Sequence, residues 1–464
     1  MIRSLAGLAA ANLVLIVLGA GILLAFGTWA RTTPLARPVF ALFAGLAGFV
    51  ALVPPLLYAG LSPTPPVVGV LSLAVLALGV LLHRRGGGAG PRDPGGGGSL
   101  LAAAAAVPLA LLGVRAVFKP LWVGDAFLDW TLKAKMLFGH GGAVRGALDE
   151  RFFTSDAYGF AHLEYPLGLP ALEAFAFHSM GVIDTRVLHV QFVVLLAAFV
   201  AALWVLLRPQ VDPVLLGAGL FLILMTQAIH IRLLTAYADI PLAVFWVAAA
   251  VALGLWVRGD GRDRLLLGAL FAAAALATKQ DGMVFCFVLF AATGVALALA
   301  RDWRRLRELA IAGAVVVATA IPWQVYAQTR GLRNPAFEPS PGSVVDRLDD
   351  LPEIAWSLAK ASVASDWLYV VPIALAAAAV LLVRGARGLA AAYLLTTLGL
   401  YAGLALVYLT TEPGRDLTVL LGQSAGRVAS TPILFAAALL PLLLAEALAP
   451  RAAGGREADE TVRE

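Results

Sequence analysis

The residues of this chain that could do chemistry lie in short polar segments between long apolar stretches, and the first such segment reads VGDAFLDWTLKAKML. It places Asp125, Asp129 and Lys133 at intervals of four residues. Residues four apart share one face of a helix, so these three form a polar stripe, with Phe127 and Leu128 left for apolar contact. The pattern predicts an amphipathic helix that lies at a membrane interface and carries two carboxylates. Simpler roles also fit, because Asp125 stands where an aspartate caps a helix, and Asp129 precedes Lys133 at ion-pair spacing.

Three later segments, HLEYPLG, HIRLLTAYADIP and ATKQDG, carry the other candidate residues. The side chains in them that could act as acids, bases or phosphate ligands are His162, Glu164, Tyr165, Arg232, Asp239, Lys279 and Gln280. Charged groups at the ends of membrane helices usually serve a site. Simpler roles exist here too, because Arg232 and Lys279 can reach lipid head groups and Tyr165 suits an aromatic belt. The histidines lack the close spacing of a metal-binding motif.

The composition excludes a water-soluble protein. Of the 464 residues, 61% are hydrophobic and 14% are charged, whereas soluble domains have roughly 45–50% and about 25%. The net charge of +5 is not gathered in a basic arm, so we expect a lipid bilayer and no nucleic acid as partner. The single cysteine, Cys286, excludes a disulfide within the chain.

The apolar stretches predict an all-α polytopic membrane protein with about thirteen transmembrane helices, since a hydrocarbon core of about 30 Å needs roughly 20 residues per crossing. The predicted spans are 4–27, 38–60, 66–83, 99–118, 187–207, 213–230, 239–257, 265–278, 283–300, 309–327, 367–383, 388–410 and 429–449. Most connections are turns, but 119–186 and 328–366 are long. Long loops on such a protein usually carry its function.

The arginines predict which side of the membrane each loop faces, because short cytoplasmic loops are rich in Lys and Arg. Arginines gather in the turns at 31–37, 84–92, 258–264, 301–307 and 384–387. With these turns inside, both long loops and all five lysines lie outside. Residues 166–181 resemble a further crossing, but 16 residues reach only about 24 Å. They also include Glu173 and His178, so we predict a helix that lies at the outer interface or dips partway in.

A Gly-rich stretch divides the chain into parts. We predict a three-helix N-terminal membrane module at 1–83, a cytoplasmic linker at 84–98, a catalytic membrane core at 99–330 with outer loop 119–186, C-terminal membrane helices at 331–449 with outer loop 328–366, and a cytoplasmic tail at 450–464. The protein is then expected in the cell (plasma or inner) membrane, with its active site on the extracytoplasmic face.

A carboxylate beside several cations at an outer membrane surface suits the transfer of a sugar from a lipid phosphate. The leaving phosphate is a stable anion, so it needs cations rather than a general acid. One carboxylate can take the proton of the acceptor hydroxyl while the anomeric carbon becomes oxocarbenium-like, which inverts the stereochemistry. A second carboxylate could instead hold a divalent cation such as Mg²⁺ or Mn²⁺.

The order of these features resembles the C-type (GT-C) glycosyltransferase superfamily, above all the bacterial relatives of the dolichyl-phosphate-mannose protein mannosyltransferases. The resemblance covers about 99 to 330. It rests on an outer loop that opens with an acidic residue, a Tyr-Pro-Leu segment, an Asp-x-Pro-Leu-Ala helix start and a Thr-Lys break. It implies that Asp125 is the catalytic base and that Lys279 contacts the donor phosphate.

The resemblance also implies a polyprenyl-phosphate sugar donor and an acceptor on the outer side, which could be a glycan, a lipid or a protein. Many members have Asp-Glu at the base, whereas Ala126 follows here, which leaves the supporting or metal-linked acid to Asp129 or Glu164. The residues left for donor-phosphate or substrate binding are Lys133, His162, Tyr165, Arg232, Asp239, Lys279 and Gln280. We therefore expect an inverting hexosyl- or pentosyltransferase of the cell envelope. The alternatives are a secondary transporter or a lipid flippase.

Overall fold

The computed structural model describes residues 1–86, 98–121, 124–140, 162, 164–332, 341–411 and 416–449. The structure is 84% helical and the residues described form no strand, so the all-α prediction is confirmed. The predicted tail 450–464 lies outside the described residues, as do most of the linker 84–98 and parts of both long loops.

The chain forms long helices that make up a bundle and short helices that lie mostly in the connections. The long helices are α1 (Ile2–Ala25), α2 (Arg37–Tyr58), α3 (Pro65–Gly86), α4 (Gly98–Phe118), α9 (Thr185–Leu207), α12 (Asp239–Val257), α13 (Arg262–Thr278), α14 (Asp281–Leu299), α15 (Trp303–Thr329), α19 (Arg387–Leu409) and α21 (Ser430–Leu448). The shorter helices and single turns are η1 (Trp29–Arg31), η2 (Ala126–Trp130), α5 (Thr131–Gly139), α8 (Gly168–Met180), α10 (Pro213–Met225), α11 (Gln227–Leu233), α16 (Pro341–Asp346), η4 (Leu348–Asp350), α17 (Leu351–Ser362), η5 (Ser365–Trp367), α18 (Val370–Val383) and α20 (Leu417–Val428).

By length and composition, nine helical segments in the described part of the chain could cross a membrane, and the bent pair α10–α11 would be a tenth. The two helices of that pair meet at an angle of 51°. Each of the thirteen predicted spans coincides with a helix or with this pair, but α4, α13 and α18 are not among the nine. The protein is therefore an all-α multi-pass membrane protein, while the number thirteen stays a prediction.

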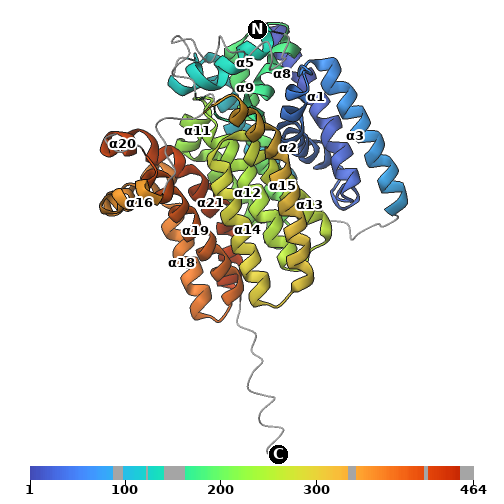
Figure 1. The fold of residues 1–464 in the computed structure, drawn as a ribbon. Helices are drawn as coiled ribbons and strands as arrows, with labels where there is room; N and C mark the ends of the chain where they lie inside the picture. Colours follow the sequence, from blue (N-terminus) through green and yellow to red (C-terminus); the bar gives the residue numbers. More distant parts are fainter. Residues whose placement is uncertain are drawn as a thin grey trace, which may run out of the picture.

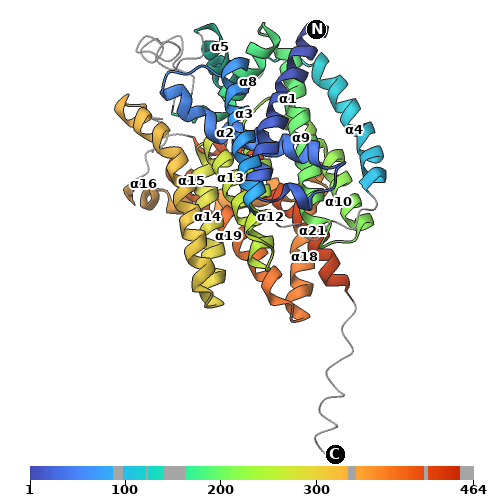
Figure 2. The ribbon, with the colours of Figure 1, turned by 90° about the vertical axis from the view of Figure 1, so that its right-hand side faces the viewer.

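The two ends of the bundle differ in their chemistry. The turns that join α14 to α15 and α18 to α19 lie at the lower end in Figure 1, beside the end of α21. These turns carry Arg301 and Arg384. At the upper end lie α5 and α8, which belong to the first long loop. Figure 2 shows α4 along the outside of the bundle, where it packs against α9.

The centre of the bundle is formed by α12, where all but two of 19 residues are buried. A helix that is apolar on every side belongs inside a larger assembly, and α12 packs against α9, α13, α14 and α21. Its first residue is Asp239, so the most enclosed helix of the protein begins with a charged side chain.

The helix α2 also lies deep in the bundle, with 14 of its 22 residues buried. The ring of Phe43 packs against Phe199 of α9, Phe245 of α12 and Phe271 of α13, with centroid separations of 6.0, 5.7 and 5.0 Å. Because its aromatic contacts reach three helices of the predicted core 99–330, α2 forms one hydrophobic core with them. The predicted N-terminal module at 1–83 therefore packs directly against the predicted catalytic part.

The helix α8 occupies the segment predicted to lie at the outer interface or to dip partway in. Eleven of its 13 residues are buried, and it packs against α1, α2 and α5. A Cβ at Gly168 would lie 2.4 Å from the carbonyl oxygen of Ala277, so the start of α8 touches the end of α13. Glu173 on α8 is 1% exposed, and burial raises the pKa of its carboxyl to about 8.

Replacing Phe43 by alanine tests whether α2 is part of the main core. We expect F43A to lower the free energy of unfolding by about 3–5 kcal/mol, because it leaves a cavity among three other rings. Equilibrium unfolding by SDS in mixed micelles measures this loss. Leu52→Ala, at a position on α2 that is 40% exposed, is the matched control and should cost far less. Equal losses in the two variants would contradict a central role for Phe43.

The burial of Glu173 predicts a pH dependence of stability. Its folded-state pKa of about 8 lies above the ordinary value of 4.5. The protonated carboxyl of Glu173 makes its full contribution to stability below pH 4.5. This contribution is lost progressively as the pH rises from 4.5 to about 8, because the unfolded state releases the proton in this range and the folded state keeps it. We expect Glu173→Gln to melt at a higher temperature than wild type at pH 8.5, with a smaller difference at pH 5. A difference that does not depend on pH would argue against a neutral buried carboxyl.

Candidate functional site

The proposed base, Asp125, is paired with an arginine that the sequence analysis did not select. The Nη1 atom of Arg427, on α20, donates a hydrogen bond of 2.5 Å to Oδ2 of Asp125. The side chain of Asp125 is 42% exposed and that of Arg427 is 30% exposed. The guanidinium also lies over the ring of Tyr237, 4.8 Å from its centroid. The carboxylate of Asp125 is thus held in place and still open to solvent.

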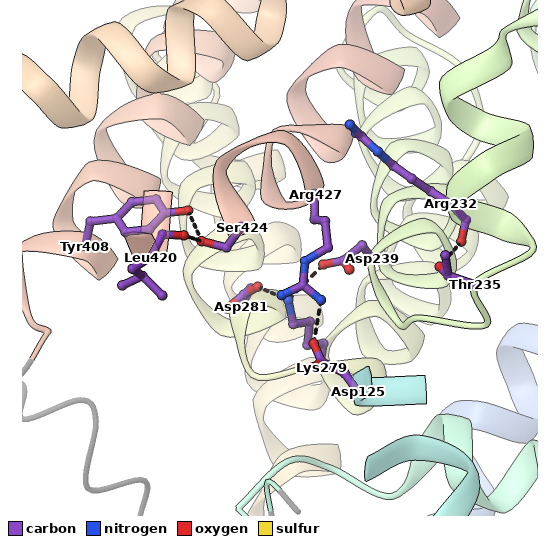
Figure 3. A network of polar contacts seen from close by, with 10 residues as sticks. All are labelled: Asp125, Arg232, Thr235, Asp239, Lys279, Asp281, Tyr408, Leu420, Ser424 and Arg427. Atoms are coloured by element: carbon purple, nitrogen blue, oxygen red, sulfur yellow. Dashed lines mark hydrogen bonds and ion pairs between the residues drawn. The ribbon is translucent and has the colours of Figure 1, made fainter. Parts of the chain in front are cut away.

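Lys279 joins two helix starts to the same cluster. Its Nζ atom lies 2.8 Å from Oδ1 of Asp239 and 2.7 Å from Oδ2 of Asp281, as Figure 3 shows. Asp239 begins α12 and Asp281 begins α14, where the helix dipole favours a negative charge. Lys279 occupies the break between α13 and α14 with an extended backbone, φ −152° and ψ 152°. Burial alone would lower the pKa of Lys279, but Asp239 and Asp281 raise it above its usual range.

In Figure 3, Arg232 lies to the right of Arg427, on the side away from Asp281. Its Nη1 atom donates to Oγ of Ser430 at 2.9 Å, and its guanidinium lies 4.9 Å from the ring centroid of Trp367. A Cβ at Gly426 would be 3.1 Å from Nη2 of Arg232, so the glycine lets this side chain pass close to α20. Arg232 therefore joins the cluster by proximity and makes no ion pair with its carboxylates.

A second cluster forms around Lys133. Its Nζ atom lies 2.6 Å from Oδ1 of Asp129, and both side chains are at most 1% exposed. It also donates to the backbone oxygen of His162. The ring of His162 stacks on Tyr165 at 4.7 Å, and its Nδ1 atom lies 3.1 Å from Oε1 of Glu164. Burial alone would raise the pKa of Glu164, but the contact with His162 lowers it below its usual value.

These positions confirm one prediction about the 125–133 segment and correct another. The ion pair of Asp129 with Lys133 is present. The continuous polar stripe is not, because η2 is a single π turn in which the N–H of Thr131 bonds to the oxygen of Ala126. The wider turn changes the helical phase, so Asp125 faces Arg427 while Asp129 faces the protein interior. The predicted placement of both carboxylates on one polar stripe at the membrane interface was therefore wrong for Asp129. Phe127 and Leu128 are 45% and 44% exposed.

The other predicted residues fall between or beside the two clusters. Tyr165 belongs to the second cluster, where its ring stacks on Trp130 and His162, and it lies within electrostatic reach of Lys279. Gln280 is exposed and, together with Glu164, lines a pocket near the end of α2. All ten predicted residues are therefore placed by the structure in two neighbouring clusters and one adjacent pocket.

An apolar groove opens beside Arg232, at the bend between α10 and α11. It contains about 470 Å³ of free space including its mouth, and its walls come from α10, α11, α18, α21 and η5. Leu222, Ile229 and Ile373 are among the apolar side chains that line it. Trp367 also lines it, and this is the ring over which Arg232 lies. One wall of the groove is thus a ring that also contacts the half-buried guanidinium of Arg232.

The carboxylates of the site fit cations of the protein better than a metal ion. Within the described ranges, no three His, Cys, Asp or Glu side chains converge as metal ligands. Asp125, Asp239 and Asp281 each face Arg427 or Lys279 at 2.5–2.8 Å. Residues so arranged do not fit the Mg²⁺ or Mn²⁺ considered from the sequence, and we assign no step to a metal.

Comparison with known proteins adds no family to this description. No family model matches the chain, and neither a curated protein nor a solved structure is similar to it.

Removing one partner of the buried pair tests its energetic role. Lys133→Met should lower the free energy of unfolding by about 3–5 kcal/mol, because it leaves Asp129 charged or protonated without its partner. The double variant K133M/D129L should recover most of this loss in SDS unfolding measurements. Lys135→Met, at a lysine that lies over the ring of Phe127, is the control and should be nearly neutral. A double variant no more stable than K133M would count against this account.

Proposed function

We propose that the protein is an integral-membrane inverting glycosyltransferase that moves a sugar from a polyprenyl-phosphate donor to an acceptor on the extracytoplasmic side. The observation that carries this proposal is the setting of Asp125. Its half-exposed carboxylate is held by Arg427, with Lys279 and Arg232 contributed by two other segments of the chain. A base beside several cations is what sugar transfer from a phosphate requires.

In the proposed reaction, Asp125 accepts the proton of the acceptor hydroxyl while the hydroxyl oxygen forms a bond to the anomeric carbon. The bond between that carbon and the phosphate oxygen breaks, and its electron pair leaves with the polyprenyl phosphate. Attack from the side opposite the phosphate inverts the configuration. The partial exposure of Asp125 supports this role, because a base must reach a hydroxyl that arrives from solvent.

The cations can be divided by their present partners. Arg232 contacts the neutral side chains of Ser430 and Trp367, and Arg427 is paired with one carboxylate, that of Asp125. Arginine presents a planar fork of donors that suits phosphate. Lys279 is already shared by Asp239 and Asp281. We therefore assign Arg427 and Arg232 to the leaving phosphate, and Lys279 would have to release a carboxylate to join them.

The apolar groove beside Arg232 supports a lipid-linked donor. A prenyl chain lying along Leu222 and Ile373 would end at Trp367, where the guanidinium of Arg232 is stacked. Apolar walls with one charged group at the end are the usual pattern of a site for an amphipathic ligand. The same arrangement supports the residue assignments for the phosphate.

A lipid flippase or secondary transporter is the second candidate, and the bent pair α10–α11 favours it. Broken helices next to a binding site are common in transporters. Such a protein would not need the carboxylate of Asp125 for chemistry. The two candidates therefore differ in what the loss of that carboxylate should do.

We expect Asp125→Asn to reduce sugar transfer by about 100-fold or more, because the variant keeps the shape of the side chain and loses the base. Purified protein in liposomes is given undecaprenyl-phosphate carrying radiolabelled mannose, galactose or arabinose. Label is then followed into the glycan, lipid and protein fractions of a membrane extract that supplies acceptors.

Asp184→Asn is the matched control. Asp184 caps the start of α9 by accepting from the N–H of Val187, and asparagine caps a helix about as well. Transfer should be unchanged in this variant. Full transfer by D125N, or no transfer by wild type from any of the three donors, would reject the enzyme. Loss of lipid movement across the bilayer in R232A without any sugar transfer in wild type would favour the flippase.

A further inference from the structure

The turn between α14 and α15 carries arginines that the packing of the bundle does not use. It lies at the lower end of the bundle in Figure 1, at the other end of α14 from Asp281. Other arginines at this end have partners within the protein. Arg258 pairs with Glu446 at 2.5 Å, and Arg305 donates to the backbone oxygen of Val257 at 3.1 Å. These contacts join helix ends and thus contribute to the fold.

Three arginines of the turn are not held in this way. Arg301 and Arg307 are exposed, and their side chains form no ion pair or hydrogen bond with the residues that the structure describes. The side chain of Arg304 is 90% exposed and lies 3.6 Å from Glu308. An ion pair as open as this one contributes little to stability. Three positive charges are therefore left facing the surroundings of the protein.

Arg301 has a backbone conformation that suits glycine. Its φ is +55°, and its N–H bonds to the oxygen of Ala298 at 3.0 Å, just after the end of α14. The same turn follows α12, α15 and α18, where Gly259, Gly331 and Gly385 occupy this position with positive φ. Glycine adopts such a φ without the steric cost that a side chain brings. The arginine therefore stands here for its charge rather than for the stability of the turn.

An exposed apolar stripe runs from these arginines along α15. Trp303, Arg307, Ile311 and Val315 follow one another at intervals of four residues, so they share one face of the helix. Trp303, Ile311 and Val315 are 65%, 55% and 58% exposed, and Leu299 at the end of α14 is 79% exposed. Figure 2 shows α14 and α15 at an edge of the bundle. Because α15 is long and apolar enough to cross a membrane, we expect the stripe to face lipid, with Trp303 at the level of the head groups.

We propose that this turn binds an anionic phospholipid, with the phosphate against Arg301, Arg304 and Arg307 and an acyl chain along the stripe that begins at Trp303. Guanidinium groups bind phosphate through charged hydrogen bonds. A zwitterionic lipid would add a positive group close to the three arginines, and a free phosphate would leave the apolar stripe uncovered. The charges and the stripe together thus favour an anionic lipid over both. The site lies at the opposite end of α14 from Asp281 and the ion-pair cluster, so the proposal does not depend on the proposed function.

Native mass spectrometry of the full chain in a neutral detergent tests the proposal. The probes are phosphatidylglycerol and phosphatidylcholine with the same acyl chains. We expect wild type to bind phosphatidylglycerol about tenfold more tightly, and this preference to fall to about twofold or less in R301Q/R304Q/R307Q, since each arginine near anionic lipid contributes up to about fivefold. R301K/R304K/R307K, which keeps the three charges, should keep most of the preference.

R84Q/R85Q/R330Q is the matched control, because it removes the same number of charges at exposed arginines outside the turn. It should keep the preference of wild type for phosphatidylglycerol. Photo-crosslinking with a phosphatidylglycerol that carries a diazirine locates the bound lipid in the chain. We expect its adducts in residues 299–315.

Arg301→Gly separates lipid binding from a structural role. Glycine removes the strain at φ +55°, so this variant should melt at a higher temperature than wild type. It should nevertheless bind phosphatidylglycerol about three- to fivefold more weakly. The proposal is overturned if wild type binds the two lipids equally, as it would if the turn served an acidic protein. It is also overturned if the control loses as much preference as the glutamine variant of the turn, if the adducts lie elsewhere, or if R301G binds the lipid as wild type does.

Discussion

The structure depends on a balance of charge at one end of the bundle, where Lys279 and Asp239 are largely shielded from water and Asp125 and Arg427 are partly open to it. Asp125, Asp239 and Asp281 face Arg427 and Lys279 at 2.5–2.8 Å, with Arg232 close by. Bringing each charge out of water costs several kcal/mol, so such a group is tolerated only with its partners in place. The partners come from the loop before η2, from the starts of α12 and α14 and from α20. The ion pairs therefore fix how these four elements meet, and any chemistry at Asp125 depends on that arrangement.

The fold class was largely readable from the sequence, because apolar runs and arginine-rich turns report the membrane directly. The all-α architecture was predicted correctly, while the number of membrane crossings stays a prediction. Residues near 125, 239 and 279 were expected to lie together, and the structure brings them together. Local geometry was harder to read. The π turn at η2 cannot be seen in the four-residue spacing of Asp125, Asp129 and Lys133, and it turned one expected stripe into two separate clusters.

Arg427 was missed because nothing local marks it. It lies in an amphipathic helix before the last span, and its importance comes from Asp125, which is 302 positions away in the chain. The cost of burying a charge next to the last predicted span marks Arg427 as a candidate functional residue. Nothing in the sequence identifies Asp125 as its partner.

The close crossing of α1 and α2 reaches further than its position suggests. A Cβ at Gly19 would lie 1.7 Å from the oxygen of Ala41, and one at Gly45 would lie 1.9 Å from the oxygen of Leu15, so the two backbones touch. Such contact leaves no slack for one helix to slide along the other. Tyr58 lies at the far end of α2. Its position along α15 is therefore set by the helix crossing at Gly45, more than a dozen residues earlier in the chain. Gly19 and Gly45 thus determine where Tyr58 lies in the lining of the pocket at the end of α2.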